Sequence, residues 1–562
     1  MTSEDFFKIE NNILIGKEVP INDSCMNIGQ LILNAFKSRP DFIGQVDAKT
    51  GEENTFQQMR ERSVKCALWL KKIGVQRNDG IVVYTSNHLD TYIPYFATLY
   101  IGAVLHVWNI NDQIHLRYHL QTGPKVIFTD VNKVSLISAI IKMMNISTRI
   151  VVFMNEMENE HKTKEEFISL KCILNNKFEQ FEIDKFSCTK LKSSKDIAVV
   201  LFSSGSTNVI KQHVTISHEF FTAPSNQQIP VMSSNDVGLW VESLHWNISL
   251  LLTVRAILSF VKAVKINIFL QFKAKGNLIS ESDCEYFYST IEKYKVNWVF
   301  LKNGMSRGFD NNFLNTTFIK YDISSLKYII IGGRQLYYEA YLQCDVLKAR
   351  IRYVYCLPET GVIAYQSSTK PDEMSSSGHV SSNVSLLIAD PNTGSPLKKG
   401  VIGTICCKSP SLTNGYLSSM SGNLEAVADS NGWFYTDDVG EYDSDGNIYV
   451  HERHRNLIVY KNITYFSLPI ICEYMLKTHK KIKDVCVIPI YESNIFHLHI
   501  AVQPKRLVQV TKDELLTFIE KELSIRCNFK VSVDIMFMSL PYLRNRYPNR
   551  AIILARRAKL LK

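Results

Sequence analysis

A stretch rich in hydroxyl side chains, SSGST at 203–207, follows the apolar run IAVVLF and precedes a lysine. After a buried strand, the backbone N–H groups of such a loop form a cradle for an anion, and hydroxyls and a lysine add donors. The candidate phosphate ligands are Ser203, Ser204, Gly205, Ser206, Thr207 and Lys211. The GxxxxGK[ST] pattern of P-loop NTPases is not present, and a polar surface turn is the favoured explanation when the loop is considered alone.

Further motifs follow this loop along the chain. They are GGRQL at 332–336, YCLPETG at 355–361, GTICCKSPSLTNGYL at 403–417 and GWFYTDDVGEYDSDGNIYVHERHRNLI at 432–458. Together with the loop, they resemble in order the TSGTTGxPKG, GGAPL, YGxTE, GEIxVxGPxxxxGY and GWxxTGDxGxxDxDGxxxxxDRxKDxI motifs of the adenylate-forming superfamily, which includes the acyl-CoA synthetases and firefly luciferase. Upstream, residues 39–79 look like the amino-terminal region of that family, so the resemblance covers almost the whole chain.

The resemblance implies a two-step reaction. A carboxylate attacks the α-phosphorus of ATP to give acyl-AMP and pyrophosphate, and the thiol of coenzyme A then displaces AMP. By the same resemblance, Tyr355 stacks on adenine, Glu359 holds Mg²⁺, and Asp438, helped by Arg453, accepts hydrogen bonds from the ribose hydroxyls. Each residue also has a structural interpretation when considered singly, as a core aromatic, a helix-terminal charge, a turn residue or a solvated strand residue.

Other positions of the family's sites also have counterparts in this sequence. Gly332 and Gly333 stand at the glycines of GGAPL in the nucleotide site, and His245 lies near the histidine or aromatic motif by the acyl pocket. Arg455 stands where the family has a charged hinge residue, about which the small carboxy-terminal domain rotates between the two half-reactions.

Some residues within these motifs differ from the family at positions that matter for the reaction. Within the motifs, Asn208, Ile210, Pro358 and Asp437 replace the glycine, proline, threonine and glycine of the family. Ile210 removes a preset φ, and Asp437 adds a carboxylate near an anionic ligand, so ATP affinity should fall.

The most serious departure is near the carboxy terminus. There PYLRNRYPNR, at 541–550, corresponds to the family's PxTxxGKxxR, and Tyr547 occupies the position of the catalytic lysine. Tyrosine is neutral at pH 7, and loss of one preorganised charge costs roughly a hundredfold to a thousandfold in rate.

The residues that surround these motifs predict the elements that position them. Helical spacing over 56–74 is followed by a buried strand pattern at GIVVYTS, and the same alternation recurs at KVIFTD, RIVVFM, NWVFLK and YIIIGG. We expect an α/β fold with largely parallel sheets. The large domain of stacked sheets flanked by helices should span 1–452, with a hinge at 453–457 and a small α+β lid at 458–562.

Composition narrows the class of protein. The chain has 562 residues, 46% of them hydrophobic, with a net charge of +10 spread over 64 basic and 54 acidic residues, which does not indicate nucleic acid binding. Its 12 cysteines, without a CxxC pair, suit a reducing compartment. The run 93–110 reads as a buried helix and a strand, so we expect no transmembrane segment. We expect a cytoplasmic protein, with the peroxisome as the alternative, although Ala558, Lys559 and Leu560 stop short of the terminus where that signal must lie.

The resulting hypothesis is an acyl-CoA synthetase-like protein with weak or lost adenylation, whose ligands are ATP or AMP, Mg²⁺, coenzyme A and a small carboxylate, expected to be a fatty acid. Two alternatives stay open: a competent ligase with a rebuilt site, and a non-catalytic protein that binds nucleotide or acyl-CoA. The sequence does not indicate an oligomeric state.

Overall fold

The computed structural model describes most of the chain. The described residues are 7–21, 27–110, 112–113, 115–153, 167–203, 212–241, 244–266, 281–302, 320–333, 351–367, 376–418, 422–454, 457–460, 464–467, 472, 475, 478–492, 495–505, 508–523 and 530–535. The chain divides into two compact units, Met1–Gln271 with Leu278–His451, and Phe272–Asn277 with Glu452–Lys562. That division falls beside the expected boundary, and the hinge at 453–457 stays a prediction.

The first large sheet has nine strands. Its order is β22 (Leu424–Glu425), β21 (Tyr416–Leu417), β11 (His213–Ser217), β10 (Ile197–Phe202), β6 (Val104–Val107), β5 (Gly80–Tyr84), β7 (Val126–Asp130), β8 (Arg149–Phe153) and β9 (Ile168–Ser169). The strands from β10 to β9 run parallel, whereas β11 is antiparallel to β10. The candidate phosphate loop therefore leaves the carboxyl edge of a parallel sheet, where ligands of such sheets commonly bind.

The second sheet also has nine strands. Its order is β18 (His379–Val380), β17 (Gly361–Tyr365), β16 (Ile351–Leu357), β15 (Tyr328–Gly332), β14 (Trp298–Lys302), β12 (Val237–Trp240), β13 (Lys262–Lys265), β3 (Ile43–Asp47) and β4 (Glu53–Thr55). From β16 to β3 the strands are parallel, and the antiparallel ones lie at the edges. The GGRQL and YCLPETG motifs thus begin on neighbouring strands, β15 and β16.

A third sheet differs from the expectation of largely parallel sheets. Its six strands are β1 (Phe7–Glu10), β2 (Ile13–Gly16), β19 (Ser385–Ala389), β20 (Gly403–Lys408), β23 (Phe434–Tyr442) and β24 (Ile448–Arg453). The pairs from β1 to β23 are antiparallel. A short link such as residues 11–12 between β1 and β2 suffices for antiparallel strands, whereas a parallel pair needs a longer crossover.

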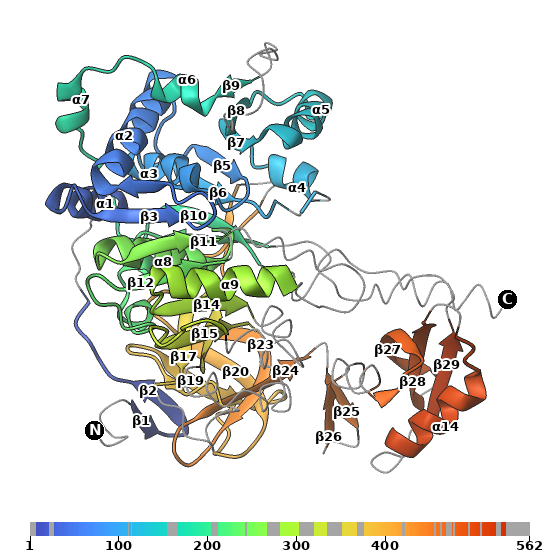
Figure 1. Ribbon diagram of the computed structural model, residues 1–562. Coiled ribbons are helices and arrows are strands. Elements are labelled where there is room, and N and C mark those ends of the chain that lie inside the picture. Colours follow the sequence, from blue (N-terminus) through green and yellow to red (C-terminus); the bar gives the residue numbers. More distant parts are fainter. Residues whose placement is uncertain are drawn as a thin grey trace. The chain divides into compact units, whose positions relative to one another are not determined.

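Helices pack between and around the two nine-stranded sheets (Figure 1). They are α1 (Ile28–Ser38), α2 (Phe56–Lys72), α3 (Tyr92–Tyr100), α4 (Leu116–Leu120), α5 (Val134–Met144), α6 (Leu170–Leu174), α7 (Gln180–Asp184), α8 (Asn247–Leu258) and α9 (Glu281–Tyr294), with single 3-10 turns at Leu89–Thr91, Val131–Lys133, Glu219–Phe221 and Pro224–Gln227. Every residue of α3 is buried, and β6 follows it, which confirms the expected buried helix and strand. Within the described residues, no helix has both the length and the apolar character needed to cross a membrane.

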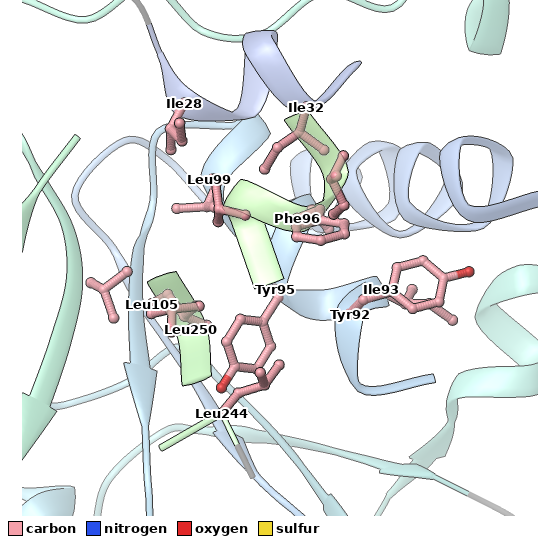
Figure 2. Close-up of a cluster of buried hydrophobic side chains, with 14 of the residues drawn as sticks. Ile28, Ile32, Tyr92, Ile93, Tyr95, Phe96, Leu99, Leu105, Leu244 and Leu250 are labelled. Atoms are coloured by element: carbon pink, nitrogen blue, oxygen red, sulfur yellow. The ribbon is translucent and has the colours of Figure 1, made fainter. Parts of the chain in front are cut away.

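The main core joins α1, α3 and α8 to the large sheets. Figure 2 shows Ile32 of α1, Phe96 and Leu99 of α3 and Leu250 of α8 in this cluster. Helix α2 also contributes to it, and it begins with a capping box in which the Thr55 hydroxyl accepts from the Gln58 amide and the Gln58 side chain accepts from the Thr55 amide. The expected α/β class is confirmed.

The second unit is α+β in content. Its described elements are β25 (Leu457–Tyr460), β26 (Thr464–Ser467), β27 (Ile482–Glu492), β28 (Ile495–Pro504), α14 (Lys512–Leu523) and β29 (Lys530–Ile535). Strands β27 and β28 are antiparallel, and β29 is parallel to β28. Leu515 and Ile519 of α14 are buried with Val485 and Ile500 of the strands, so this unit has a core of its own.

Candidate nucleotide-binding site

The base of the candidate phosphate loop is a strand pair. Strand β10 ends at Phe202, which lies opposite His213 at the start of β11. The Ser203 amide donates to the Gln212 carbonyl at 3.0 Å, and the Gln212 amide donates to the Ser203 hydroxyl oxygen at 3.3 Å. Two hydrogen bonds therefore close the loop where it begins and ends. The other candidate phosphate ligands, Ser204, Gly205, Ser206, Thr207 and Lys211, lie outside the described residues.

Tyr355 and Asp438 are in direct contact. The Tyr355 hydroxyl on β16 donates to Asp438 Oδ2 on β23 at 2.8 Å, and both side chains are buried. Burial, followed by the negative charge of Asp438, raises the pKa of Tyr355 well above its usual value, so the phenol keeps its proton and acts as the donor. The residues expected to contact adenine and ribose thus lie side by side, although their motifs are far apart in the sequence.

Asp437 has the backbone conformation of the glycine that it replaces. Its φ is +62°, in the left-handed region that favours glycine, and the side chain is half-buried. Aspartate tolerates this region better than most residues because its short polar side chain can bond locally. The fold therefore accommodates the substitution, at the cost of a carboxylate directly before Asp438.

Glu359 lies in the turn between β16 and β17. It is 6% exposed, its Oε1 accepts from the Tyr416 hydroxyl at 3.2 Å, and its carbonyl accepts from the Thr413 amide at 2.7 Å. Burial, then the charge of Glu359, raises the pKa of Tyr416. Sequence reasoning did not select Tyr416, although it is the tyrosine of the NGYL motif.

A single carboxylate is a common protein contribution to a Mg²⁺ site, since this ion usually takes its other ligands from water and substrate phosphates. Within the described ranges, no group of three or more potential metal ligands is present. Glu359 therefore fits a Mg²⁺ ion that is bound together with a nucleotide. The described residues do not form a metal site made of protein ligands alone.

Gly332 of the GGRQL motif ends β15, and Gly333 directly follows the strand. A Cβ atom on Gly332 would come within 2.8 Å of the Phe300 ring, so this glycine lets the ring pack against the strand. Gly333 has a φ of +100°, which requires glycine. The structure thus accounts for both glycines by local geometry, and their contact with nucleotide stays a prediction.

His245 lies between β12 and α8 and is half-buried. The next residue, Trp246, packs on Phe300 with ring centroids 5.4 Å apart, and Trp240 packs on Trp298 at 4.9 Å. Three of these rings, those of Trp240, Trp298 and Phe300, border a small hollow. It is lined by Leu239, Trp240, Val241, Ser249, Leu252, Trp298 and Phe300. The aromatic residues before and after His245 in the sequence, Trp240 and Trp246, therefore both pack on other aromatic rings.

The remaining predicted residues belong to the second unit. Arg453 ends β24, and its amide donates to Glu452 Oε1 at 3.0 Å. Its role toward the ribose stays a prediction, because Asp438 belongs to the other unit. Arg455 and Tyr547 lie outside the described residues.

Known proteins resemble this chain over most of its length. The family model described as AMP-binding enzyme matches residues 34–417. The chain belongs to the AMP-binding enzyme family. This family lies within the adenylate-forming superfamily, as the order of the motifs implied, and the match includes Ser203, His245, Tyr355 and Glu359.

Individual relatives of this family member are distant but cover nearly the full length. The chain is 26% identical to probable 4-coumarate–CoA ligase 1 of Dictyostelium discoideum, over 92% of this chain and 90% of that one. It is 25% identical to luciferin 4-monooxygenase of Photuris pensylvanica, over 85% and 86%. Its fold matches that of ATP-bound MatB from Rhodopseudomonas palustris with a TM-score of 0.73 at 17% identity, over 96% of this chain and 100% of that one.

Proposed function

We propose that this protein is an acyl-CoA synthetase-like member of the family that binds the nucleoside part of ATP and forms acyl-adenylate slowly. The observation that carries the proposal is the Tyr355–Asp438 hydrogen bond, which joins two sheets at 2.8 Å and builds the nucleoside end of the site. The positions that contact the phosphates and promote the chemistry are the ones that depart from the family.

In the proposed reaction, a carboxylate oxygen attacks the α-phosphorus of ATP, the bond to pyrophosphate breaks, and acyl-AMP forms. The thiol of coenzyme A then attacks the acyl carbon and AMP leaves. Asp438 orients the ribose, and Tyr355 contributes its ring to adenine and its hydroxyl to Asp438. Glu359 would hold Mg²⁺, which neutralises charge on the phosphates when it is bound. His245 and Arg453 have supporting roles toward the substrate and the ribose.

Slow adenylation follows from Tyr547. During attack, negative charge builds on the oxygens at phosphorus, and the family lysine stabilises that charge, whereas a neutral tyrosine does not. Asp437 acts in the same direction because it adds a negative charge before Asp438. Complete loss of adenylation, as in the pseudoenzyme hypothesis, would be the extreme case of this slowing.

The substrate that we propose is a compact carboxylate. The rings of Trp240, Trp298 and Phe300 line the hollow beside β12 and α8, and Trp246 packs on Phe300. A long acyl chain that entered beside His245 would have to displace these rings, so the expected fatty acid is less well supported than a short or planar acid.

ATP–pyrophosphate exchange with acids of increasing length tests the proposal. Wild-type protein and the Arg546→Gly/Tyr547→Lys variant are compared on each acid, and Trp246→Gly tests the size limit. We expect the double variant to exchange at least tenfold faster, about 1.4 kcal/mol of barrier, and to prefer compact acids.

Equal rates for the two proteins on a shared substrate would instead identify a competent ligase with a rebuilt site. AMP binding without exchange by either protein would identify a non-catalytic binding protein.

A further inference from the structure

Helix α5 has apolar side chains on two opposite faces. Val134 and Ile137 are buried in a core that includes strands of the first sheet and α4, and Ile141 packs against that core. At about 100° per residue, positions 136, 139, 140 and 143 lie on the other side of the helix. We call these residues the outer stripe: Leu136, Ala139, Ile140 and Met143.

The outer stripe faces solvent at the outside of the first sheet (Figure 1). The exposed fraction is 61% for Met143 and 37% for Leu136, Ala139 is also exposed, and Ile140 is half-buried. Single exposed apolar side chains are common, but a surface helix normally presents polar residues on the face away from its core. An exposed apolar row with helical spacing therefore indicates an interaction surface.

The segment that contains this helix is positively charged. Between residues 115 and 149 the sequence has a single acidic residue, Asp130, whose carboxylate accepts from the Thr85 hydroxyl and, at 3.3 Å, from the Ser86 amide. The same range has five basic residues, all exposed except the half-buried Lys133: Arg117, Lys125, Lys133, Lys142 and Arg149. The Arg149 amide donates to the Lys125 carbonyl at 3.0 Å, so two of these cations start neighbouring strands just after α5 ends.

The charge decides which partner fits the outer stripe. An apolar helix face beside basic residues is typical of a helix that lies at the boundary between the headgroups and acyl chains of an anionic membrane. A second copy of this chain, docked through the same face, would bring the same positive charges together. Anionic lipid headgroups would instead neutralise those charges.

We propose that α5 docks the protein on an anionic lipid surface. The outer stripe enters the layer beneath the headgroups, and the basic residues around the helix contact the lipid phosphates. Docking is reversible, because a stripe of four side chains buries far less apolar area than a membrane-spanning helix. This inference is independent of the proposed nucleotide binding and catalysis.

Co-sedimentation of the full-length protein with lipid vesicles measures the docking. Vesicles of phosphatidylcholine alone are compared with vesicles in which about a third of the lipid is phosphatidylserine. We expect binding to the anionic vesicles to be at least about tenfold stronger and to weaken as salt shortens the Debye length from about 10 Å at 0.1 M to about 3 Å at 1 M. Equal binding to both kinds of vesicle, or binding to neither, overturns the inference and leaves the proposed function intact.

A pair of serine substitutions tests the apolar part of the surface. Leu136→Ser with Met143→Ser should lower the affinity for the anionic vesicles at least about tenfold. The control is Phe181→Ser with Val231→Ser, which replaces two apolar side chains that are at least as exposed but lie outside α5, and it should bind as wild type does. If the α5 variant keeps its vesicle binding and instead loses self-association in sedimentation velocity, the stripe is a contact between copies and the inference is overturned.

A pair of glutamine substitutions tests the charge. Lys125→Gln with Arg149→Gln should lower the affinity for the anionic vesicles about tenfold, since each cation near such a surface favours binding. The control Lys398→Gln with Lys399→Gln removes the same charge from another exposed segment and should change the affinity less than about twofold. Equal losses in the two charge variants would overturn the inference. All the replaced side chains are exposed, so each variant should keep the urea midpoint of wild type, which is measured first.

Discussion

Replacement of Asp437 tests how the altered motif weakens nucleotide binding. Asp437 has a φ of +62° and directly precedes Asp438, which is the proposed ribose ligand. Asp437→Gly removes the charge and restores the family residue, while Asp437→Asn removes the charge from a residue type that still tolerates positive φ. The two variants therefore separate electrostatics from backbone strain.

The size of the effect follows from Coulomb's law for an assumed separation between the Asp437 carboxylate and the α-phosphate. At an assumed separation of about 8 Å and an effective dielectric constant of about 20 to 40, two unit charges repel each other by about 1–2 kcal/mol. This corresponds to a gain in AMP affinity of roughly five- to thirtyfold in both variants. Asp437→Gly relieves the left-handed conformation, which costs an ordinary residue about 1–2 kcal/mol, but the greater backbone entropy of glycine in the unfolded chain offsets about 0.5–1 kcal/mol of this gain. The free energy of unfolding should therefore change by less than about 1 kcal/mol.

Isothermal titration calorimetry with AMP at low and high salt measures this gain. Because the effect is electrostatic, it should shrink as salt rises. Asn235→Gly is the matched control, since Asn235 also has a positive φ, of +75°, but is exposed and carries no charge. If neither Asp437 variant binds AMP more tightly than wild type, Asp437 does not repel the phosphate and our interpretation of this motif is wrong.

Three further results are expected. Tyr355→Phe should lower the free energy of unfolding by about 1.5–3 kcal/mol, because the buried Asp438 carboxylate loses a donor, and an unchanged urea midpoint would count against that bond. Chelation of Mg²⁺ by EDTA should lower the ATP affinity of the wild-type protein about tenfold. Glu359→Gln should abolish this effect of EDTA and leave AMP affinity unchanged, and an EDTA effect that persists in the variant would place Mg²⁺ elsewhere. Burial lowers the pKa of His106 and His218 to about 4, below the value near 6.5 of the unfolded chain. The free energy of unfolding should therefore be fully present above pH 6.5 and should fall below it by about 1 kcal/mol per pH unit for each of the two imidazoles. An unfolding midpoint that is equal at about pH 7.5 and about pH 5.5 would refute this.

Much of the fold could be predicted because parallel strands that are buried on both faces appear as continuous apolar runs. Strands β5, β7, β8, β14 and β15 lie where those runs occur, and α2 ends two residues before Gly74, whose φ is +85°. The antiparallel third sheet was missed because β2 and β19 pair across a large separation in sequence and because its strands alternate less regularly, as in β20 with its adjacent buried cysteines Cys406 and Cys407.

The order of the motifs supplied the candidate site residues, whose roles stay predictions, but it could not supply the contacts between them. Motif order identified Tyr355 and Asp438, yet the bond between them joins residues 83 positions apart on different sheets. The His119–His213 contact spans 94 positions, and nothing in the sequence indicates that these two residues pair. Spacing along the chain does not encode such distant pairs. The packing of Trp246 on Phe300 likewise depends on how β14 lies beside α8, which the sequence alone does not show.

The central claim is that the nucleoside end of the site is intact while its phosphate end is weakened. Calorimetric comparison of AMP with Mg–ATP on the wild-type protein tests it most directly, because the two ligands share the nucleoside proposed to contact Tyr355 and Asp438 and differ only in their phosphates and metal. We expect the two dissociation constants to agree within about tenfold, or about 1.4 kcal/mol. Mg–ATP that binds about a hundredfold more tightly than AMP, a difference of about 2.7 kcal/mol, would show that the phosphate loop works as in an intact family member and would contradict the account.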